Sequence, residues 1–370
     1  MVSEAVGLAR RIADERLGPL AARLDREQSF SDSLWNEIFE FGLPGIPFDT
    51  ATGGAGGTYL EYCDVVEAFT RRAAVSTSYH APAVLVASAL AEFAPALGEE
   101  FTPDILGGRR KACWAFTEPQ TGSDPKQITT TAVLQGDTWV LNGEKTFITL
   151  ASVADLALVF ARGDGGRLNA ILVDTAQPGW QPGPPMRFMA FGGAATGPVH
   201  LDDVVAPANR LVGAVGEGFE ILLRVEAAGK IRAAATCVGI AQRAEELAVA
   251  YAQQRTHRGS PIGTKFESIQ WLLGEIGASV EAARALTREA ARNHDCGNDV
   301  HRIAAAARLI AARTARVVTS DALQVFGSYG VLEDSEIARL YREGKFFEVG
   351  QGVVEIQRRI IARGLLSEAE

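Results

Sequence analysis

The sequence predicts an α+β fold in which a helical first part, a β-rich middle and a helical last part follow one another. Three observations support this prediction. Apolar residues recur at helical spacing in residues 1–108, short β-branched runs separated by turns fill 109–212, and long Ala-rich helical segments occupy 213–370. We take these ranges as three domains, which suits a chain of 370 residues that is 47% hydrophobic.

The first domain is predicted to consist of helices. The apolar face of its first helix is expected to carry Leu8, Ile12, Leu17 and Leu20. Ser31 or Asp32 can cap the next helix, which is expected to end at Gly42. Further along, Thr102-Pro103 predicts the start of a short helix that Gly107-Gly108 ends.

Strands are predicted for the middle domain and a helix bundle for the last. Glycine-containing turns separate the expected strands of an antiparallel β domain, which cover 128–134, 138–141, 156–161 and 168–173. The stretch from Gln177 to Pro185 contains four prolines and predicts no regular element. Helical periodicity returns from Glu217, and the bundle is expected to contain the segments 231–253, 266–293 and 301–326.

Composition and charge exclude several classes of function. A net charge of −9 without a basic stripe argues against binding to nucleic acid. The N-terminus lacks the apolar core of a signal peptide, and no apolar run is long enough to span a membrane. Four scattered cysteines without a C-x-x-C pair are typical of free thiols in a reducing compartment. We therefore expect a soluble cytoplasmic protein that uses no metal and binds neither nucleic acid nor membrane.

The most specific motif is WAFTEPQTGSD, from Trp114 to Asp124, in which a short apolar strand runs into a loop rich in hydroxyl groups. Thr117 and Ser123 supply hydroxyls and Gly122 lets the main chain approach closely, so the loop can hold a planar cofactor. The string resembles the flavin-binding TEP-x-x-GSD signature of the acyl-CoA dehydrogenase family. Further matches to this family follow in order over nearly the whole chain: GEKTFIT (143–149), DDVVAP (202–207), GEGF (216–219), YAQQR (251–255), ALQVFGSYG (322–330), YREGK (341–345) and QGVVEIQRRIIARGLL (351–366).

This resemblance implies an acyl-CoA dehydrogenase-like architecture: a helical N-terminal domain, a β-barrel-like middle domain and a C-terminal four-helix bundle. It implies FAD as the cofactor, placed between the middle domain and the bundle and partly contacted by a neighbouring subunit. A homodimer or homotetramer is therefore expected. The implied partners are an acyl thioester substrate, on an acyl carrier protein or on CoA, and an electron acceptor such as an electron-transfer flavoprotein.

The resemblance also assigns cofactor-binding residues. One subunit is expected to contribute Phe116, Thr117, Gly122, Ser123, Phe147 and Thr149, and its partner Arg255, Gln324, Gly327 and Ser328. Phe147 stands where the family usually has a tryptophan stacked on the flavin, although a phenylalanine here could equally be a core aromatic. The guanidinium of Arg255 suits a pyrophosphate. Ser328 replaces a usual glycine, and His257 and Arg258 depart from the family pattern near Arg255.

The catalytic base of the family is missing from this chain. In the family, a glutamate in an E-G-T-x-x-I-Q-R string takes the α-proton of the thioester, and here the string begins Gln351-Gly352. The amide of Gln351 has no comparable basic lone pair, although its backbone N–H remains available to the thioester oxygen. Some relatives place the glutamate at the position of Gly229, so that base is absent as well. Glu226 and Glu348 lie nearby at other registers and are weaker candidates.

Other departures accompany the missing base. Lys230 stands where arginine is usual, Gly350 replaces a bulky residue, and Val353 replaces threonine. We expect Gln351 and Gly352 at the reacting centre and Ser123, Lys230 and Gly350 at the substrate. These changes point to altered chemistry, or to drift in a pocket that still binds an acyl chain.

The favoured function is a FAD-dependent oxidation of a carrier-bound hydroxyacyl or aldehyde group, which needs only an O–H proton to leave. Short family members of this kind occur in polyketide gene sets, where they form hydroxymalonyl on an acyl carrier protein, a precursor of methoxymalonyl extender units. This chain is similar in length and in its C-terminal departure. The alternatives are an acyl-CoA dehydrogenase with a relocated base, a flavin-dependent monooxygenase or N-hydroxylase of the same fold, and a flavin-loaded interaction protein without enzymatic activity.

Overall fold

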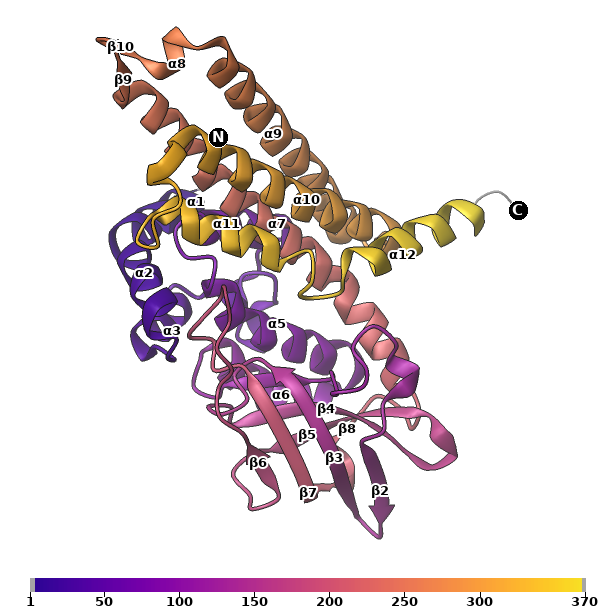
Figure 1. Ribbon diagram of the computed structural model, residues 1–370. Helices are drawn as coiled ribbons and strands as arrows, with labels where there is room; N and C mark the ends of the chain where they lie inside the picture. The colour runs from indigo at the N-terminus through magenta and orange to yellow at the C-terminus, as the bar shows by residue number, and fades with distance from the viewer. Residues whose placement is uncertain (1–3, 368–370) are drawn as a thin grey trace.

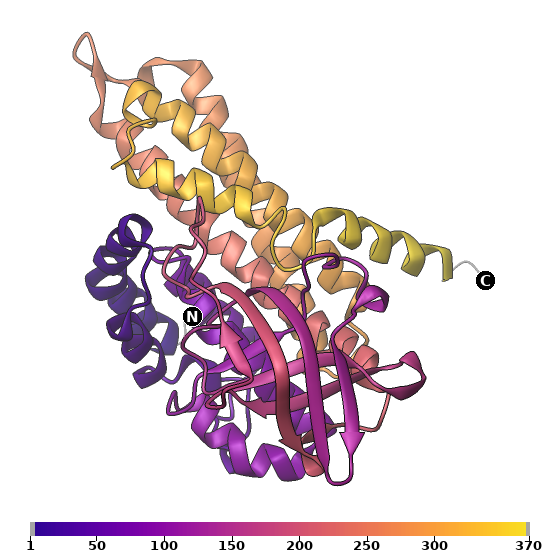
Figure 2. The ribbon, with the colours of Figure 1, turned by 60° about the horizontal axis from the view of Figure 1, so that its bottom comes forward.

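The computed structural model describes residues 4–367 and shows helices at both ends of the chain around a central β domain (Figure 1). The β domain lies against the N-terminal helices, and the long C-terminal helices extend away from both. Figure 2 shows the sheet curling beneath the bundle. The predicted fold class is therefore confirmed.

The N-terminal part contains α1 (Glu4–Ile12), a π-helical turn (Ala13–Leu17), α2 (Gly18–Glu27), α3 (Asp32–Glu40), α4 (Tyr59–Thr70), α5 (Ser76–Phe93) and α6 (Pro95–Leu106). The predicted face of the first helix was partly wrong, because Leu8 is exposed and the buried side is formed by Val6, Ala9, Ala13 and Leu17. The π turn changes the spacing between turns, which no strict 3.6-residue pattern anticipates. Ser31 caps α3 by accepting a hydrogen bond from the Leu34 amide (3.2 Å).

The helix predicted to begin at Thr102-Pro103 instead begins at Pro95 and ends at Leu106. Ala94, with φ of −149°, interrupts the chain after α5, and Pro95 then occupies the first turn of α6, where its missing N–H costs nothing. Pro103 lies near the C-terminal end of the helix, and Gly107 follows as predicted.

The middle of the chain forms one eight-stranded sheet in the order β6-β7-β3-β2-β4-β5-β8, with β1 added beside β4. Its strands are β1 (Ala112–Ala115), β2 (Thr131–Gln135), β3 (Thr138–Ile148), β4 (Leu156–Arg162), β5 (Leu168–Asp174), β6 (Trp180–Pro182), β7 (Gly197–Pro207) and β8 (Leu211–Val212). The prediction of a purely antiparallel domain was wrong, because β1 runs parallel to β4. Residues 156–161 of β4 are all buried, as expected for a strand covered on both faces.

Part of the proline-rich stretch also forms a strand, contrary to prediction. Residues Trp180–Pro182 pair with β7 at one end of the sheet order. An edge strand leaves one row of N–H groups without a ladder partner, so Pro182 is tolerated there.

The C-terminal part contains α7 (Gly218–Gln254), a small hairpin of β9 (Thr256–His257) and β10 (Ser260–Pro261), α8 (Ile262–Lys265), α9 (Glu267–Asp295), α10 (His301–Phe326), α11 (Glu336–Phe346) and α12 (Val354–Ser367). Helix α7 starts at Gly218 rather than Ile231, so its first turns contact the β domain. Small buried residues such as Ala244, Ala248 and Ala252 recur every four positions, which allows close helix packing.

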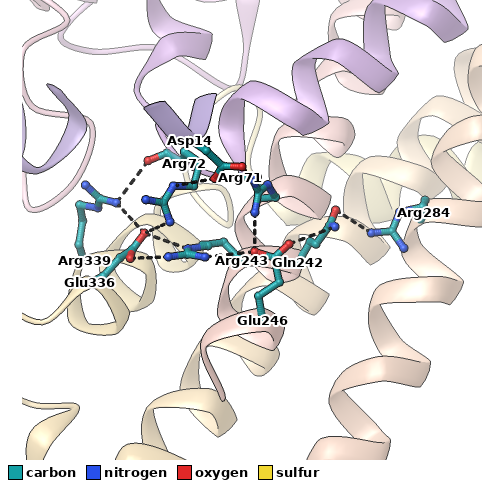
Figure 3. Close-up of polar contacts among 9 residues, drawn as sticks. All are labelled: Asp14, Arg71, Arg72, Gln242, Arg243, Glu246, Arg284, Glu336 and Arg339. Atoms are coloured by element: carbon teal, nitrogen blue, oxygen red, sulfur yellow. Dashed lines mark hydrogen bonds and ion pairs between the residues drawn. The ribbon is translucent and has the colours of Figure 1, made fainter. Parts of the chain in front are cut away.

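A network of ion pairs fastens the N-terminal helices to the bundle (Figure 3). Arg243 of α7 makes a two-point contact with Glu336 of α11, from Nε at 3.0 Å and from Nη2 at 2.9 Å. Arg71, which follows α4, donates to Glu246 of α7 at 2.6 Å and also pairs with Asp14. Such a network fixes the relative placement of segments that lie far apart in sequence. None of the helices in residues 4–367 is both long and apolar enough to cross a membrane.

Candidate active site

The loop predicted to hold a planar cofactor is built around a buried ion pair. The Glu118 carboxylate accepts hydrogen bonds from the backbone amides of Thr129 (2.7 Å) and Thr130 (3.0 Å) and from Lys145 Nζ (2.8 Å). Lys145 also donates to the carbonyl oxygens of Phe116 (3.2 Å) and Phe160 (2.7 Å). Both charged side chains are fully buried. This pair joins β1, β3 and β4 to the loop.

The ionisation of this pair follows from its surroundings. Burial by itself would raise the pKa of Glu118, but Lys145 and the threonine donors outweigh it and lower the pKa. Burial lowers the pKa of Lys145 against the opposing influence of Glu118. Sequence reasoning missed both as structural residues of the site, although each lies inside a motif that it used.

The ends of β1 and β3 bring the first group of predicted cofactor residues together. The Thr146 amide donates to the Thr117 carbonyl (2.9 Å), so Phe116 and Thr117 lie beside Phe147 and Thr149. The loop residues Gly122 and Ser123 are exposed on the same segment as Thr117.

Phe147 departs from the regular strand. Its φ is +56°, and the pairing of β3 with β7 shifts register between Lys145 and Ile148, which is a bulge. The side chain is 57% exposed, and its ring centroid lies 6.3 Å from that of Phe188. A strained backbone that carries a solvent-exposed aromatic ring is typical of a ligand-binding position rather than of a core position.

The second predicted group lies elsewhere in the chain. Arg255 follows the end of α7, and Gln324, Gly327 and Ser328 lie at the end of α10; all four are exposed. The rings of Tyr251 and Phe326 stack at 4.3 Å, which keeps these two helix ends together. Figure 1 places the α8–β10 end of the bundle away from the β domain. The two groups therefore do not meet within one chain, and a shared cofactor between subunits stays a prediction.

Gln351 and Gly352 occupy the connection between α11 and α12. Both have left-handed backbones, with φ of +54° and +81°. Arg308 of α10, which is completely buried, donates from Nη2 to the carbonyls of Phe347 and Gly350 (2.7 Å) and thereby holds the connection. A Cβ at Gly350 would lie 2.6 Å from the Phe346 ring, so only glycine fits here without displacement.

The loop that contains Phe191 and Ala194 links this connection to the end of β3. The Leu150 amide donates to the Ala194 carbonyl (3.0 Å), and the ring centroids of Phe191 and of Phe346, the last residue of α11, lie 4.4 Å apart. Figures 1 and 2 both place the loop that carries Gly122 on the same side of the molecule as the α11–α12 connection. The loop of the first cofactor group and the predicted reacting centre therefore lie on the same side of the molecule.

A buried arginine that the sequence analysis did not single out contacts Gln351. Arg232 of α7 is 2% exposed and donates from Nη2 to Gln351 Oε1 (2.9 Å) and from Nη1 to Thr77 Oγ1 (2.6 Å). A guanidinium can only donate, so the amide oxygen of Gln351 must face it. The amide NH₂ is then left to face other groups. The sequence signal that could have identified Arg232 was an arginine within the Ala-rich stretch of α7.

The acidic residues near the site differ in their availability. Glu348 is paired with Arg316 (2.8 Å) and Lys345 (2.6 Å). Glu226 is half-buried and has no ion pair within 4.0 Å in the described chain; its Oε2 lies 3.5 Å from the point that a Cβ at Gly229 would occupy. Lys230 is buried, its Nζ lies 3.3 Å from the carbonyl oxygen of Glu226, and burial lowers its pKa.

Comparison with known proteins identifies the family. The acyl-CoA dehydrogenase N-terminal, middle and C-terminal domain models match residues 3–109, 113–204 and 216–366. The chain is 33% identical to a 3-(aryl)acrylate reductase of Clostridium sporogenes, with 97% of each protein covered. It is 29% identical to the CarC subunit of the caffeyl-CoA reductase-Etf complex of Acetobacterium woodii, over 98% of this chain and 97% of that protein.

Comparison of structures agrees with this result. Butyryl-CoA dehydrogenase from Megasphaera elsdenii superimposes with a TM-score of 0.95 at 31% identity, covering 98% of this chain and 97% of that one. The protein therefore belongs to the acyl-CoA dehydrogenase family and is a FAD-dependent oxidoreductase.

Proposed function

We propose that this enzyme oxidises an acyl thioester at a carbon that already bears oxygen, either a hydroxyl-bearing carbon or a hydrated aldehyde. The observation that carries the proposal is the contact of Arg232 with Gln351, the residue that the family motif assigns to the position of the carboxylate base. An amide held by a guanidinium cannot accept a proton from a weakly acidic α-carbon. Oxidation of an alcohol needs no such carboxylate base, because the proton leaves from oxygen rather than from carbon.

The first cofactor group fits a flavin, because the exposed ring of Phe147 and the polar edge formed by Thr117, Ser123 and Thr149 suit a planar aromatic ligand. FAD, when bound, supplies a two-electron acceptor that takes a hydride. In the proposed reaction the oxygen-bearing carbon loses the hydride, the hydroxyl proton passes to water, and a hydrated aldehyde becomes a carboxylic acid. Gln351 is positioned to donate from its amide NH₂ to the substrate oxygen.

We further propose that the acyl group is a hydroxylated three-carbon unit on an acyl carrier protein, converted to hydroxymalonyl for polyketide synthesis. The support is the similarity in length and C-terminal departure noted in the sequence. An electron-transfer flavoprotein is the proposed acceptor, because a relative that is 29% identical is named as a subunit of a reductase-Etf complex. A homodimer or homotetramer is proposed because the Arg255 group lies apart from the Phe147 group.

The test is an anaerobic titration of the FAD-loaded protein, monitored at the absorbance band of oxidised flavin. Carrier-bound hydroxyacyl and aldehyde groups are expected to bleach the band, and butyryl-CoA is expected to leave it unchanged. The opposite pattern, with enoyl product from butyryl-CoA, would refute the proposal.

A second candidate is α,β-desaturation, or its reverse, with Glu226 as a relocated base. One observation favours it: the Glu226 carboxylate lies over Gly229, which has no side chain to exclude it. The reductase relatives, by their names, act on related acrylate and acyl-CoA compounds. In this case butyryl-CoA bleaches the flavin in the wild type, and Glu226→Gln abolishes that bleaching while FAD stays bound.

A further inference from the structure

Two buried arginines contact the α11–α12 connection at Gln351 and Gly350, and a buried lysine lies within electrostatic reach of one of them. Lys230, Arg232 and Arg308 are 9%, 2% and 0% exposed. Arg232 and Glu226 both influence the pKa of Arg308, and burial lowers that pKa, so these groups lie within electrostatic reach of one another. Glu226 is the only carboxylate that the described contacts and charges associate with Lys230 and Arg308. The cluster therefore carries an excess of positive charge.

Arg232 has no counterion in contact with it. Both of its described hydrogen-bond partners, Thr77 Oγ1 and Gln351 Oε1, are neutral oxygens, and within residues 4–367 no carboxylate lies within 4.0 Å of it. A buried charge without a partner is costly, and it is usually paired. Two other buried cations have charged partners, since Lys145 contacts Glu118 and Arg339 contacts Glu343 and Glu336. The described hydrogen bonds of buried Arg308, in contrast, go to backbone carbonyls.

The neighbouring titratable groups do not supply the missing negative charge. Tyr62 Oη lies 2.9 Å from His80 Nδ1, and both side chains are buried. Burial raises the pKa of Tyr62 and lowers the pKa of His80, so both stay neutral around pH 7. Arg308 leaves Nε and Nη1 without a partner, which adds unused donors to the same region.

We propose that Arg232 binds an acyl group that ends in a carboxylate, so that the substrate or product supplies the counterion. This inference rests on the proposed placement of the acyl group beside Gln351. Two donors then act together on the terminal oxygens: the guanidinium of Arg232 and the amide NH₂ of Gln351. A charge-assisted contact of this kind selects an anionic acyl chain over a neutral chain of the same shape.

The experiment compares two thioesters with the FAD-loaded full chain by isothermal titration calorimetry. Malonyl-CoA ends in a carboxylate, and isovaleryl-CoA has the same branched shape without charge. The wild type is expected to bind malonyl-CoA about 10- to 100-fold more tightly, the range for one hydrogen bond to a charged group. Arg232→Gln is expected to remove this preference. The matched control is Arg224→Gln, which removes an exposed arginine from the same helix, where it pairs with Glu92, and should keep the preference.

Several outcomes would overturn the inference. A wild type that binds both thioesters equally would do so, as would a preference that survives in Arg232→Gln. Equal weakening of both thioesters, together with a shifted flavin reduction potential, would show that Arg232 serves the negative charge of reduced flavin instead. If Arg232→Gln fails to load FAD, the inference is still tested by comparing the affinities of the two thioesters in the wild type and in Arg232→Lys. A malonyl preference without any bleaching by hydroxyacyl groups would refute the proposed oxidation and leave this inference intact.

Discussion

Replacing Glu118 by glutamine tests whether the cofactor loop depends on its buried ion pair. Glu118→Gln removes the counterion of Lys145 while keeping the size of the side chain, and it leaves a fully buried ammonium without a charge partner. Removal of one partner from a buried pair costs about 3–5 kcal/mol. We therefore expect the free energy of unfolding to fall by this amount at pH 7.

The assay is urea denaturation followed by tryptophan fluorescence, since Trp114 lies in β1, just before the loop, and Trp139 lies in β3, the strand of Lys145. Glu144→Gln is the matched control: it removes an exposed carboxylate from the same strand as Lys145 and is expected to cost less than about 0.5 kcal/mol. The double variant Glu118→Gln/Lys145→Met should recover much of the lost stability, because neither buried charge remains.

The pH dependence provides an independent check. The pKa of Glu118 is lower in the folded protein than its ordinary value of 4.5, so its stabilisation is complete above pH 4.5 and is lost as the pH falls further. The difference between wild type and Glu118→Gln should shrink in the same window. A loss below about 1 kcal/mol at pH 7, or an equal loss in Glu144→Gln, would refute the reasoning.

Three further changes have defined expected outcomes. Gln351→Glu places a carboxylate against Arg232, whose guanidinium lowers its pKa, so α-proton abstraction from butyryl-CoA should stay slow and rise only when Arg232→Gln is added, as measured by flavin bleaching. Unchanged native turnover in Gln351→Glu would show that this residue is not at the reacting centre. Phe147→Ala should weaken FAD binding at least about 10-fold in a fluorescence titration and leave unfolding within about 1 kcal/mol, because the ring is exposed. Burial raises the pKa of Glu343 to about 7, so the wild type loses stability as the pH rises from 4.5 to 7; the free energy of unfolding of Glu343→Gln relative to wild type should therefore rise by about 2–3 kcal/mol between pH 5 and pH 8 in urea titrations.

Local sequence patterns predicted the order and type of most elements. Helix α10 has the predicted bounds of His301 and Phe326, because its apolar repeat is uninterrupted. The failures lie where local rules compete. A π turn displaced the buried face of α1, a proline fell inside α6, and β1 joined a strand far along the chain in a parallel pairing that alternation alone does not reveal.

The sequence by itself determined the family of this protein and predicted that Gln351 stands at the family's base position, since both depend on residue identity in an ordered motif. Only the tertiary structure showed which side chain Gln351 contacts. Arg232 of α7 and Gln351 of the α11–α12 connection are separated by 119 residues in sequence, yet Arg232 Nη2 lies 2.9 Å from Gln351 Oε1. Because the unpaired charge of Arg232 is buried, an anion that binds to it is stabilising. Burial is a property of the packed fold rather than of any local stretch of chain.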